Sequence, residues 1–296
     1  MALASKFSNG PIKTFSIGFP DESSYNELPY ARVIAKHFET EHHEFQVRPN
    51  AIEILPKLIY HLEEPFAYAS LIPTYYLCQV ARRHVTVALA GDGGDEIFAG
   101  YNRYFWDRWA TQYQKVPSWL RKSVFHPLVS SFPEGEHKGL VNIFRRIKKF
   151  VRSAELKRHD RYLQWFALMN DDTREQILNG VSSRSRASEI FLDYFKSSGA
   201  QDSLRQMQFV DINTMLLDGS MLKADKMSMA HSLELRVPFL DHRLVDFSYN
   251  LPQTMKLNGG NKKYLLKKIL SKYVPISKHQ SRLPLRSLWD HKKRQG

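Results

Sequence analysis

The sequence predicts an α/β fold: a parallel sheet with helices over residues 1–110, followed by a mainly helical region over residues 111–296. Strand-like and helix-like segments alternate in the first part with short links between them, which is typical of βαβ units. Beyond Tyr101 the chain becomes aromatic and basic, prolines interrupt it, and helix-period apolar patterns follow. Because crossover connections are right-handed, helices should cover both faces of the sheet.

The pattern of apolar residues indicates which segments form each element. Three short apolar or alternating segments are expected to be strands: 12–19, 42–47 and 85–90. Segments with apolar residues at helical spacing are expected to be helices: 26–37, 51–61, 73–84, 140–152, 160–170 and 201–217. The continuous apolar character of 12–19 and 85–90 predicts that these two strands lie at or near the centre of the sheet, covered on both faces.

Composition and charge restrict the class of protein. The chain has 296 residues, a formal net charge of +13 and a single cysteine, which fits a reducing cytoplasm. Residues 1–100 hold 8 Lys+Arg and 12 Asp+Glu, so the positive charge lies in the rest of the chain. The basic C-terminal segment has no aromatic interleaving or base-reading motif, so we expect no specific nucleic-acid binding. No signal-peptide core or membrane-span pattern is seen, so no membrane association is expected.

The most informative motif is VTVALAGDGGDEIFAGY at residues 85–101, where a strand leads through a glycine-rich turn into a helix start. Glycines let the backbone turn sharply and approach a ligand closely. Asp92, Asp95 and Glu96 follow the carboxyl end of the strand, where ligands bind in open α/β sheets. Carboxylates beside exposed backbone N–H groups suit Mg²⁺ that bridges to phosphate oxygens. The alternative is a tight turn with solvated acidic residues.

Three blocks of sequence point to a known family. Residues 14–19 read TFSIGF, residues 90–101 read AGDGGDEIFAGY and residues 223–241 read KADKMSMAHSLELRVPFLD. In this order they resemble the adenine-pocket strand, the second signature and the long downstream motif of glutamine-hydrolysing asparagine synthetases. The similarity runs from about Leu3 to about Tyr273. It implies the C-terminal synthetase domain of that family, with a parallel sheet of the ATP-pyrophosphatase (adenine nucleotide α-hydrolase-like) type and residues 111–296 as the mainly helical part of the same domain.

Two parts of the family pattern are absent from this sequence. Residue 2 is alanine where the family's glutaminase domain has its catalytic cysteine, and the only cysteine is Cys78. The family's pyrophosphate loop, a Ser-Gly-Gly-x-Asp-Ser pattern, is also not in the chain. We therefore expect a truncated synthetase domain whose sheet is incomplete at the N-terminus. We also expect that the isolated chain does not make asparagine at a useful rate, because the missing loop would neutralise the departing pyrophosphate.

The resemblance also implies the chemistry and the partners. ATP would activate the aspartate side chain as β-aspartyl-AMP with release of pyrophosphate, and ammonia would then displace AMP. The implied cofactors are ATP and Mg²⁺, and the ammonia would come from glutamine through a glutaminase domain that is absent here. A homodimer is compatible with the resemblance.

Individual residues receive roles by matching the family motifs. Asp92 matches a catalytic carboxylate, Asp95 a metal ligand, Ala90 and Gly91 backbone contacts to the nucleotide, and Ile17 a residue that packs on adenine. The alternative for Ile17 is ordinary strand core. Asp225 is a candidate for contact with the substrate amine, and Asp218 is a weaker one. Lys278 is a candidate to replace the lysine of the family's C-terminal Arg-x-Lys-x-Gly-Phe element, which this sequence lacks.

Two charged pairs receive structural interpretations. Glu63 and Glu64 precede a predicted helix, and favourable electrostatics at a helix start is preferred over catalysis for them. Glu234 and Arg236 alternate around Leu235, which suggests a buried ion pair that holds the helical region on the sheet.

Three functions remain open on the sequence. The first is asparagine synthesis, and the second is a related acyl-adenylating ligase that acts on another carboxylate. Asp92 argues against the second, because lactam-forming relatives carry a tyrosine at that place. The third is a non-catalytic fragment that keeps the fold.

Overall fold

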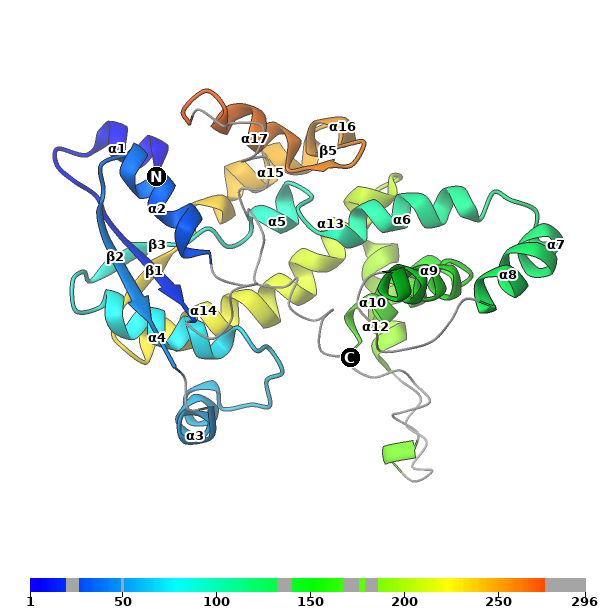
Figure 1. Cartoon of the computed structure of the whole chain (residues 1–296), viewed down its shortest axis with the longest axis horizontal. Helices are drawn as coiled ribbons and strands as arrows, with labels where there is room; N and C mark the ends of the chain where they lie inside the picture. The colour runs from blue at the N-terminus through cyan, green and yellow to red at the C-terminus, as the bar shows by residue number, and fades with distance from the viewer. Residues whose placement is uncertain (20–26, 49–50, 132–139, 168–175, 179–185, 275–296) are drawn as a thin grey trace. The chain divides into compact units, whose positions relative to one another are not determined.

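The computed structural model describes residues 1–296 except 20–26, 49–50, 132–139, 168–175, 179–185 and 275–296 (Figure 1). The chain divides into two compact units. Unit 1 combines residues 1–100 with residues 212–296, and unit 2 consists of residues 101–211. This division differs from the predicted one at residue 110, because the chain returns to the first unit at Ile212 and packs a helix of its long downstream motif there.

Unit 1 contains both strands and helices. Its strands are β1 (Lys13–Gly18), β2 (Glu41–Gln46), β3 (Val87–Leu89), β4 (Glu234–Arg236), β5 (Leu257–Asn258) and β6 (Asn261–Lys262). Its helices are α1 (Ala2–Phe7), α2 (Leu28–His37), α3 (Ala51–Leu62), α4 (Leu71–Ala81), α5 (Gly94–Ile97), α14 (Leu222–Met229), α15 (His242–Asn250), α16 (Gln253–Lys256) and α17 (Tyr264–Leu270), with the π-helix η3 (Ile212–Met221) and the 3-10 helix η4 (Pro238–Leu240).

The strands of unit 1 form separate pairs rather than one sheet. β1 pairs with β2 in parallel, with Ile17 opposite Phe45, and β3 pairs with β4 in parallel, with Ala88 opposite Leu235. β5 and β6 form a short antiparallel pair. The predicted strands at 12–19, 42–47 and 85–90 therefore appear as β1, β2 and the shorter β3, and β1 and β2 run parallel to each other as predicted. Within the described residues, the prediction that 12–19 and 85–90 share one sheet is wrong.

The prediction of a buried strand at 85–90 is also wrong. β3 covers only Val87–Leu89, and Val87 and Leu89 are 41% and 64% exposed. Ala88, on the opposite face, packs against the hydrophobic core. An apolar run allows burial on both faces, but burial also needs other elements to pack there. Here β3 has β4 on one edge and α4 on one face.

The hydrophobic core of unit 1 is built on α4. One cluster joins α3, α4 and α14 through Ile54, Leu58, Leu62, Leu71, Tyr75 and Met227. A second cluster places Cys78 and Ala81 of α4 against Leu233, with Phe15 of β1 and Ala88 of β3 packed on it. The same helix therefore supports both parallel pairs, and Figure 1 shows α4 beside β1 and α14.

Unit 2 is helical in its described part. Its elements are α6 (Asn102–Tyr113), α7 (Ser118–Leu120), the π-helix η2 (Arg121–Phe125), α8 (His126–Ser130), α9 (Leu140–Ala154), α10 (Arg158–Phe166), α12 (Arg186–Ser197) and α13 (Ser203–Asp211). The helices predicted over 140–152 and 160–170 correspond to α9 and α10, and the one over 201–217 becomes α13 followed by η3. In the part of the chain that the structure describes, we find no helix with the length and apolar character needed to cross a bilayer.

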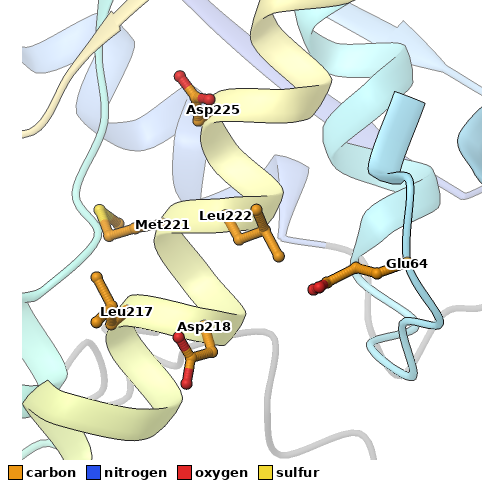
Figure 2. Close-up of a pocket in the computed structure, with 6 residues that line it drawn as sticks. All are labelled: Glu64, Leu217, Asp218, Met221, Leu222 and Asp225. Carbon is orange, nitrogen blue, oxygen red and sulfur yellow. The ribbon is translucent and has the colours of Figure 1, made fainter.

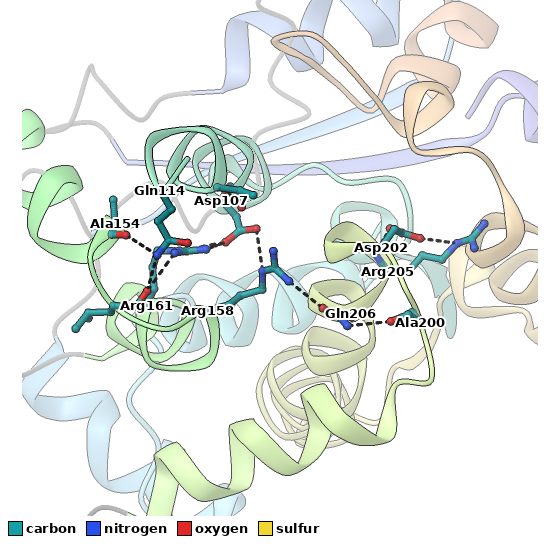
Figure 3. Close-up of polar contacts among 11 residues, drawn as sticks. Asp107, Gln114, Ala154, Arg158, Arg161, Ala200, Asp202, Arg205 and Gln206 are labelled. Carbon is teal, nitrogen blue, oxygen red and sulfur yellow. Dashed lines mark hydrogen bonds and ion pairs between the residues drawn. The ribbon is translucent and has the colours of Figure 1, made fainter. Parts of the chain in front are cut away.

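Buried ion pairs join the helices of unit 2. Asp107 of α6 accepts hydrogen bonds from the guanidinium of Arg161 in α10, and both side chains are fully buried. Arg158 lies 3.5 Å from the other carboxylate oxygen of Asp107 and also donates to Gln206 of α13 (Figure 3). Gln114 donates to the carbonyl of Ala154 at the end of α9. Because loss of either partner would leave the other charge buried and uncompensated, the contact between Asp107 and Arg161 favours the packing of α6 against α10.

Candidate active site

The glycine-rich turn after β3 is the centre of the candidate site. The N–H of Ala90 donates to the carbonyl of Arg236 at 2.9 Å, which extends the β3–β4 pairing by one residue into the turn. Gly93 has φ +85°, and a Cβ there would lie 2.3 Å from Cδ2 of Leu240. Only glycine meets both conditions without strain. A Cβ on Gly91 would meet nothing within 4 Å, so the surface at Gly91 is open.

The three carboxylates of the turn have different surroundings. Asp92 is half-buried, whereas Glu96 is only 2% exposed. Asp95 forms an ion pair with Lys263, with 2.9 Å between its Oδ1 and the Nζ of the lysine. The predicted carboxylate cluster is thus close in sequence, but its members differ in exposure and in charged partners.

Lys223 of α14 brings a positive charge to Asp92 and Glu96. Its side chain is buried, and its Nζ lies 3.4 Å from Oγ of Ser70. Burial lowers the pKa of Lys223 below its ordinary value, while the charges of Asp92 and Glu96 act in the opposite direction. A buried ammonium with acidic neighbours is the arrangement expected where a site holds charged reactants.

The Mg²⁺ predicted at Asp95 does not fit the residues around it. Mg²⁺ needs hard oxygen ligands in octahedral geometry, and an adjacent ammonium competes for the same carboxylate oxygen. The described residues contain no group of three or more His, Cys, Asp or Glu side chains that could hold a metal ion. Asp95 is therefore positioned for its ion pair with Lys263 rather than for a resident metal.

An acidic cavity of about 670 Å³ contains the residues predicted to contact the substrate amine. Asp218 of η3 and Asp225 of α14 lie on one continuous helical stretch, and Glu64 approaches from the segment after α3 (Figure 2). The apolar residues that line the cavity are Leu217, Met221 and Leu222. Three carboxylates in one hollow favour a cationic group over an anionic one.

The remaining predicted residues are placed as follows. Ile17 is half-buried in β1, and its contact with adenine stays a prediction. Its predicted position in one cleft with Gly91, Asp92 and Asp95 also stays a prediction. Lys278 lies outside the described residues.

The two structural interpretations of charged pairs are wrong. Glu63 follows the last residue of α3 with φ +63°, so it lies at a helix end, and it accepts a hydrogen bond from Lys226 at 2.7 Å. This hydrogen bond lowers the pKa of Glu63. Glu234 and Arg236 do pair with each other at 2.7 Å, but their side chains are 56% and 65% exposed. β4 is a short strand with only its central residue turned inward, so its alternating charges face solvent.

Sequence reasoning missed two lysines of the site. Lys223 opens the 223–241 block, and Lys263 lies in the Lys262-Lys263-Tyr264 stretch, yet the motifs assign neither a role. Only Lys223 had a usable signal. It lies four residues before Met227, so helical spacing places it on the same inward face of α14.

Comparisons with known proteins agree with the three sequence blocks. A family model described as asparagine synthase matches residues 1–281. The chain is 34% identical over 265 residues to asparagine synthetase [glutamine-hydrolyzing] 1 of Bacillus subtilis, covering 89% of this chain and 40% of that protein. It is 30% identical over 268 residues to a putative asparagine synthetase [glutamine-hydrolyzing] of Mycobacterium tuberculosis, covering 90% of this chain and 39% of that protein.

A more distant similarity is to amidase chyE of Penicillium rubens, at 23% identity over 288 residues, covering 89% of this chain and 41% of that protein. The chain spans about 40% of the length of the curated relatives that it matches. The family match covers nearly all of the chain, including the turn after β3 and the helix that carries Lys223. This chain belongs to the asparagine synthase family.

Proposed function

We propose that this chain supplies the ATP- and aspartate-binding part of an asparagine synthetase. The observation that carries the proposal is the turn at residues 90–96, where Asp92 interacts electrostatically with the buried Lys223 beside an open surface at Gly91. The family relationship supports ATP and aspartate as the reactants. ATP would enter as its magnesium complex, so the metal is part of the nucleotide substrate. Cys78 is a buried single thiol, which fits action in the cytoplasm.

The proposed reaction has two steps. A carboxylate oxygen of aspartate attacks the α-phosphorus of ATP, which forms β-aspartyl-AMP and releases pyrophosphate. Ammonia then attacks the acyl carbon, and asparagine and AMP leave. The role of Asp92 is to accept a proton from ammonium, because only neutral ammonia is a nucleophile. Lys223 would compensate negative charge that accumulates around the turn.

The acidic cavity suits the other end of the substrate. Aspartate carries an ammonium group, and Asp218 and Asp225 can accept hydrogen bonds from it. We therefore assign the α-amino group of aspartate to this cavity, with Asp225 as the first candidate for contact.

Nucleotide binding is the first test of the proposal. Isothermal titration calorimetry with α,β-methylene-ATP should show binding to the purified chain. Gly91→Val should weaken this binding by at least about tenfold, because a side chain at an open position blocks close approach of the backbone to the ligand. Gly10→Val is the matched control, since a Cβ at Gly10 also meets nothing within 4 Å. Equal binding by both variants, or none by the parent chain, would contradict the proposal.

Chemistry is the second test, and it separates the alternatives. Because the family's pyrophosphate loop is not in this chain, AMP release is measured with the chain joined to the upstream segment of the family. There it should require both aspartate and ammonium, and Asp92→Asn should reduce it by about 10²-fold or more, as expected for loss of a general base. AMP release with a different carboxylate would favour a related acyl-adenylating ligase. Binding of the nucleotide without AMP release would favour the non-catalytic fragment.

A further inference from the structure

The ion pair between Asp95 and Lys263 is largely shielded from solvent. The two side chains are 14% and 8% exposed, and 2.9 Å separates Oδ1 of Asp95 from Nζ of Lys263. Both residues belong to unit 1, although they are 168 positions apart in the sequence. Removing one partner of a poorly solvated ion pair leaves the other charge uncompensated, so the pair resists separation.

The backbone is shaped around this pair. A Cβ on Gly100 would lie 1.8 Å from Oδ1 of Asp95 and 2.3 Å from Cε of Lys263, so only glycine leaves room for the contact. The N–H of Gly100 also donates to the carbonyl of Asp95 at 2.8 Å. Lys263 itself has φ +51°, a left-handed conformation that is unfavourable for a lysine. Such a conformation persists where surrounding contacts determine it.

The ion pair between Asp95 and Lys263 connects two segments that are distant in the sequence. Asp95 belongs to the turn that follows β3, and Lys263 immediately precedes α17 and follows the β5–β6 hairpin. The segment 257–270 is thereby attached to the candidate nucleotide turn by an ion pair between the buried Lys263 and the largely shielded Asp95 rather than by strand pairing.

We propose that Lys263 is a positioning residue that supplies the permanent positive charge at Asp95, in the place where the family motif implies a divalent metal. Its ammonium holds the carboxylate in one orientation and keeps the turn at residues 91–96 in the shape that binds the ligand. The ion pair does not depend on the proposed function, whereas its consequence for nucleotide binding rests on it.

Metal titration tests the assignment without any catalytic readout. Mn²⁺ binding to the full chain, followed by electron paramagnetic resonance without nucleotide, should be the same for the parent and for Asp95→Asn. Loss of a stoichiometric Mn²⁺ site in Asp95→Asn would overturn the proposal, because Asp95 would then be a metal ligand.

Unfolding by urea tests the pairing itself. Asp95→Asn and Lys263→Gln should each lower the midpoint, since each takes the partner charge away from a buried group. The double variant removes both charges at nearly constant size, so its midpoint should lie nearer the parent's than that of either single variant. Additive losses would overturn the proposal.

Nucleotide affinity tests the positioning role. Lys263→Gln should raise the dissociation constant for α,β-methylene-ATP at least tenfold, and Lys263→Arg should recover part of the loss because it keeps the charge. Lys268→Gln is the matched control, because Lys268 is an exposed lysine on α17. An unchanged dissociation constant in a folded Lys263→Gln variant would overturn the positioning role. Absence of nucleotide binding by the parent chain would instead contradict the proposed function, and the metal and urea measurements would then decide whether the pair forms.

Discussion

Arg103 donates a hydrogen bond to Asp211 at 2.7 Å inside unit 2, where both side chains are buried. The same oxygen of Asp211 accepts hydrogen bonds from the hydroxyls of Tyr104 and Tyr162. Burial raises the pKa of Asp211 above its ordinary value, while Arg103 acts against this shift. The cluster links α6, α10 and α13, and it is closed to solvent. Its role is therefore to hold these helices together rather than to meet a substrate.

Breaking this pair should destabilise the protein. Asp211→Asn or Arg103→Met should lower the free energy of unfolding by about 3–5 kcal/mol, because each takes the partner away from a buried charged group. Urea unfolding followed by circular dichroism measures the change. Arg243→Met is the control, since it removes an exposed pair with Asp241 and should leave the midpoint unchanged. Similar losses of unfolding free energy for the Arg103–Asp211 and Arg243–Asp241 pairs would show that burial does not determine how much an ion pair contributes to stability.

The core of unit 1 gives a second prediction on stability. Leu58→Ala should cost about 2–5 kcal/mol, because Leu58 is fully buried between α3, α4 and α14 and its removal leaves a cavity. Ile59→Ala is the neighbouring control, since Ile59 is 54% exposed and should cost less than about 1 kcal/mol. Equal effects would mean that α3 does not pack as described.

Cys78 should respond to pH in a defined direction. Burial raises the pKa of its thiol to about 11, above the ordinary value of 9.0. A group with a raised pKa in the folded state contributes stability below its unfolded pKa and loses that contribution as the pH rises through the folded value. As the pH rises from about 9 to about 11, the parent should therefore lose free energy of unfolding relative to Cys78→Ala, which has no thiol to ionise.

Thiol reactivity checks the same environment of Cys78 directly. The native chain should react slowly with 5,5′-dithiobis(2-nitrobenzoic acid) at about pH 8, and the urea-unfolded chain should react at the rate of a free thiol. Rapid reaction of the native chain would contradict the burial of Cys78.

Local patterns predicted most of the elements that the structure shows. The helical spacing of apolar residues predicted α3 and α9, and the alternating and apolar runs predicted β1, β2 and β3, each to within a few residues. These predictions succeeded because each depends on neighbours in sequence. The family of the chain could also be predicted, since three sequence blocks resemble the motifs of the family in their order, and a family model matches residues 1–281.

Long-range relationships could not be predicted in the same way. The apolar run at 85–90 predicts a buried strand, but whether Val87 and Leu89 are covered depends on elements distant in sequence. The neighbours of Asp95 in the turn suggest a metal ligand, whereas its partner is Lys263, and a single sequence gives no signal that joins positions so far apart. The prediction for Glu63 failed for the same reason, because its partner is Lys226.

Gly100, which follows α5, should tolerate a side chain poorly as long as the ion pair is formed. A Cβ on Gly100 would lie 1.8 Å from Oδ1 of Asp95, so Gly100→Ala must displace the carboxylate from Lys263. Such overpacking typically costs about 1–3 kcal/mol, which urea unfolding can measure.

Two comparison variants test whether the stability lost in Gly100→Ala comes from the clash with Asp95. Gly10→Ala should leave the stability nearly unchanged, because a Cβ at Gly10 meets nothing within 4 Å. Removing the clashing carboxylate with Asp95→Ala in the Gly100→Ala background should cost less than Asp95→Ala costs in the parent, since the ion pair is already broken there. If Gly100→Ala is as stable as Gly10→Ala, the turn has room that the structure does not show, and the enclosed pair between Asp95 and Lys263 is not formed in solution.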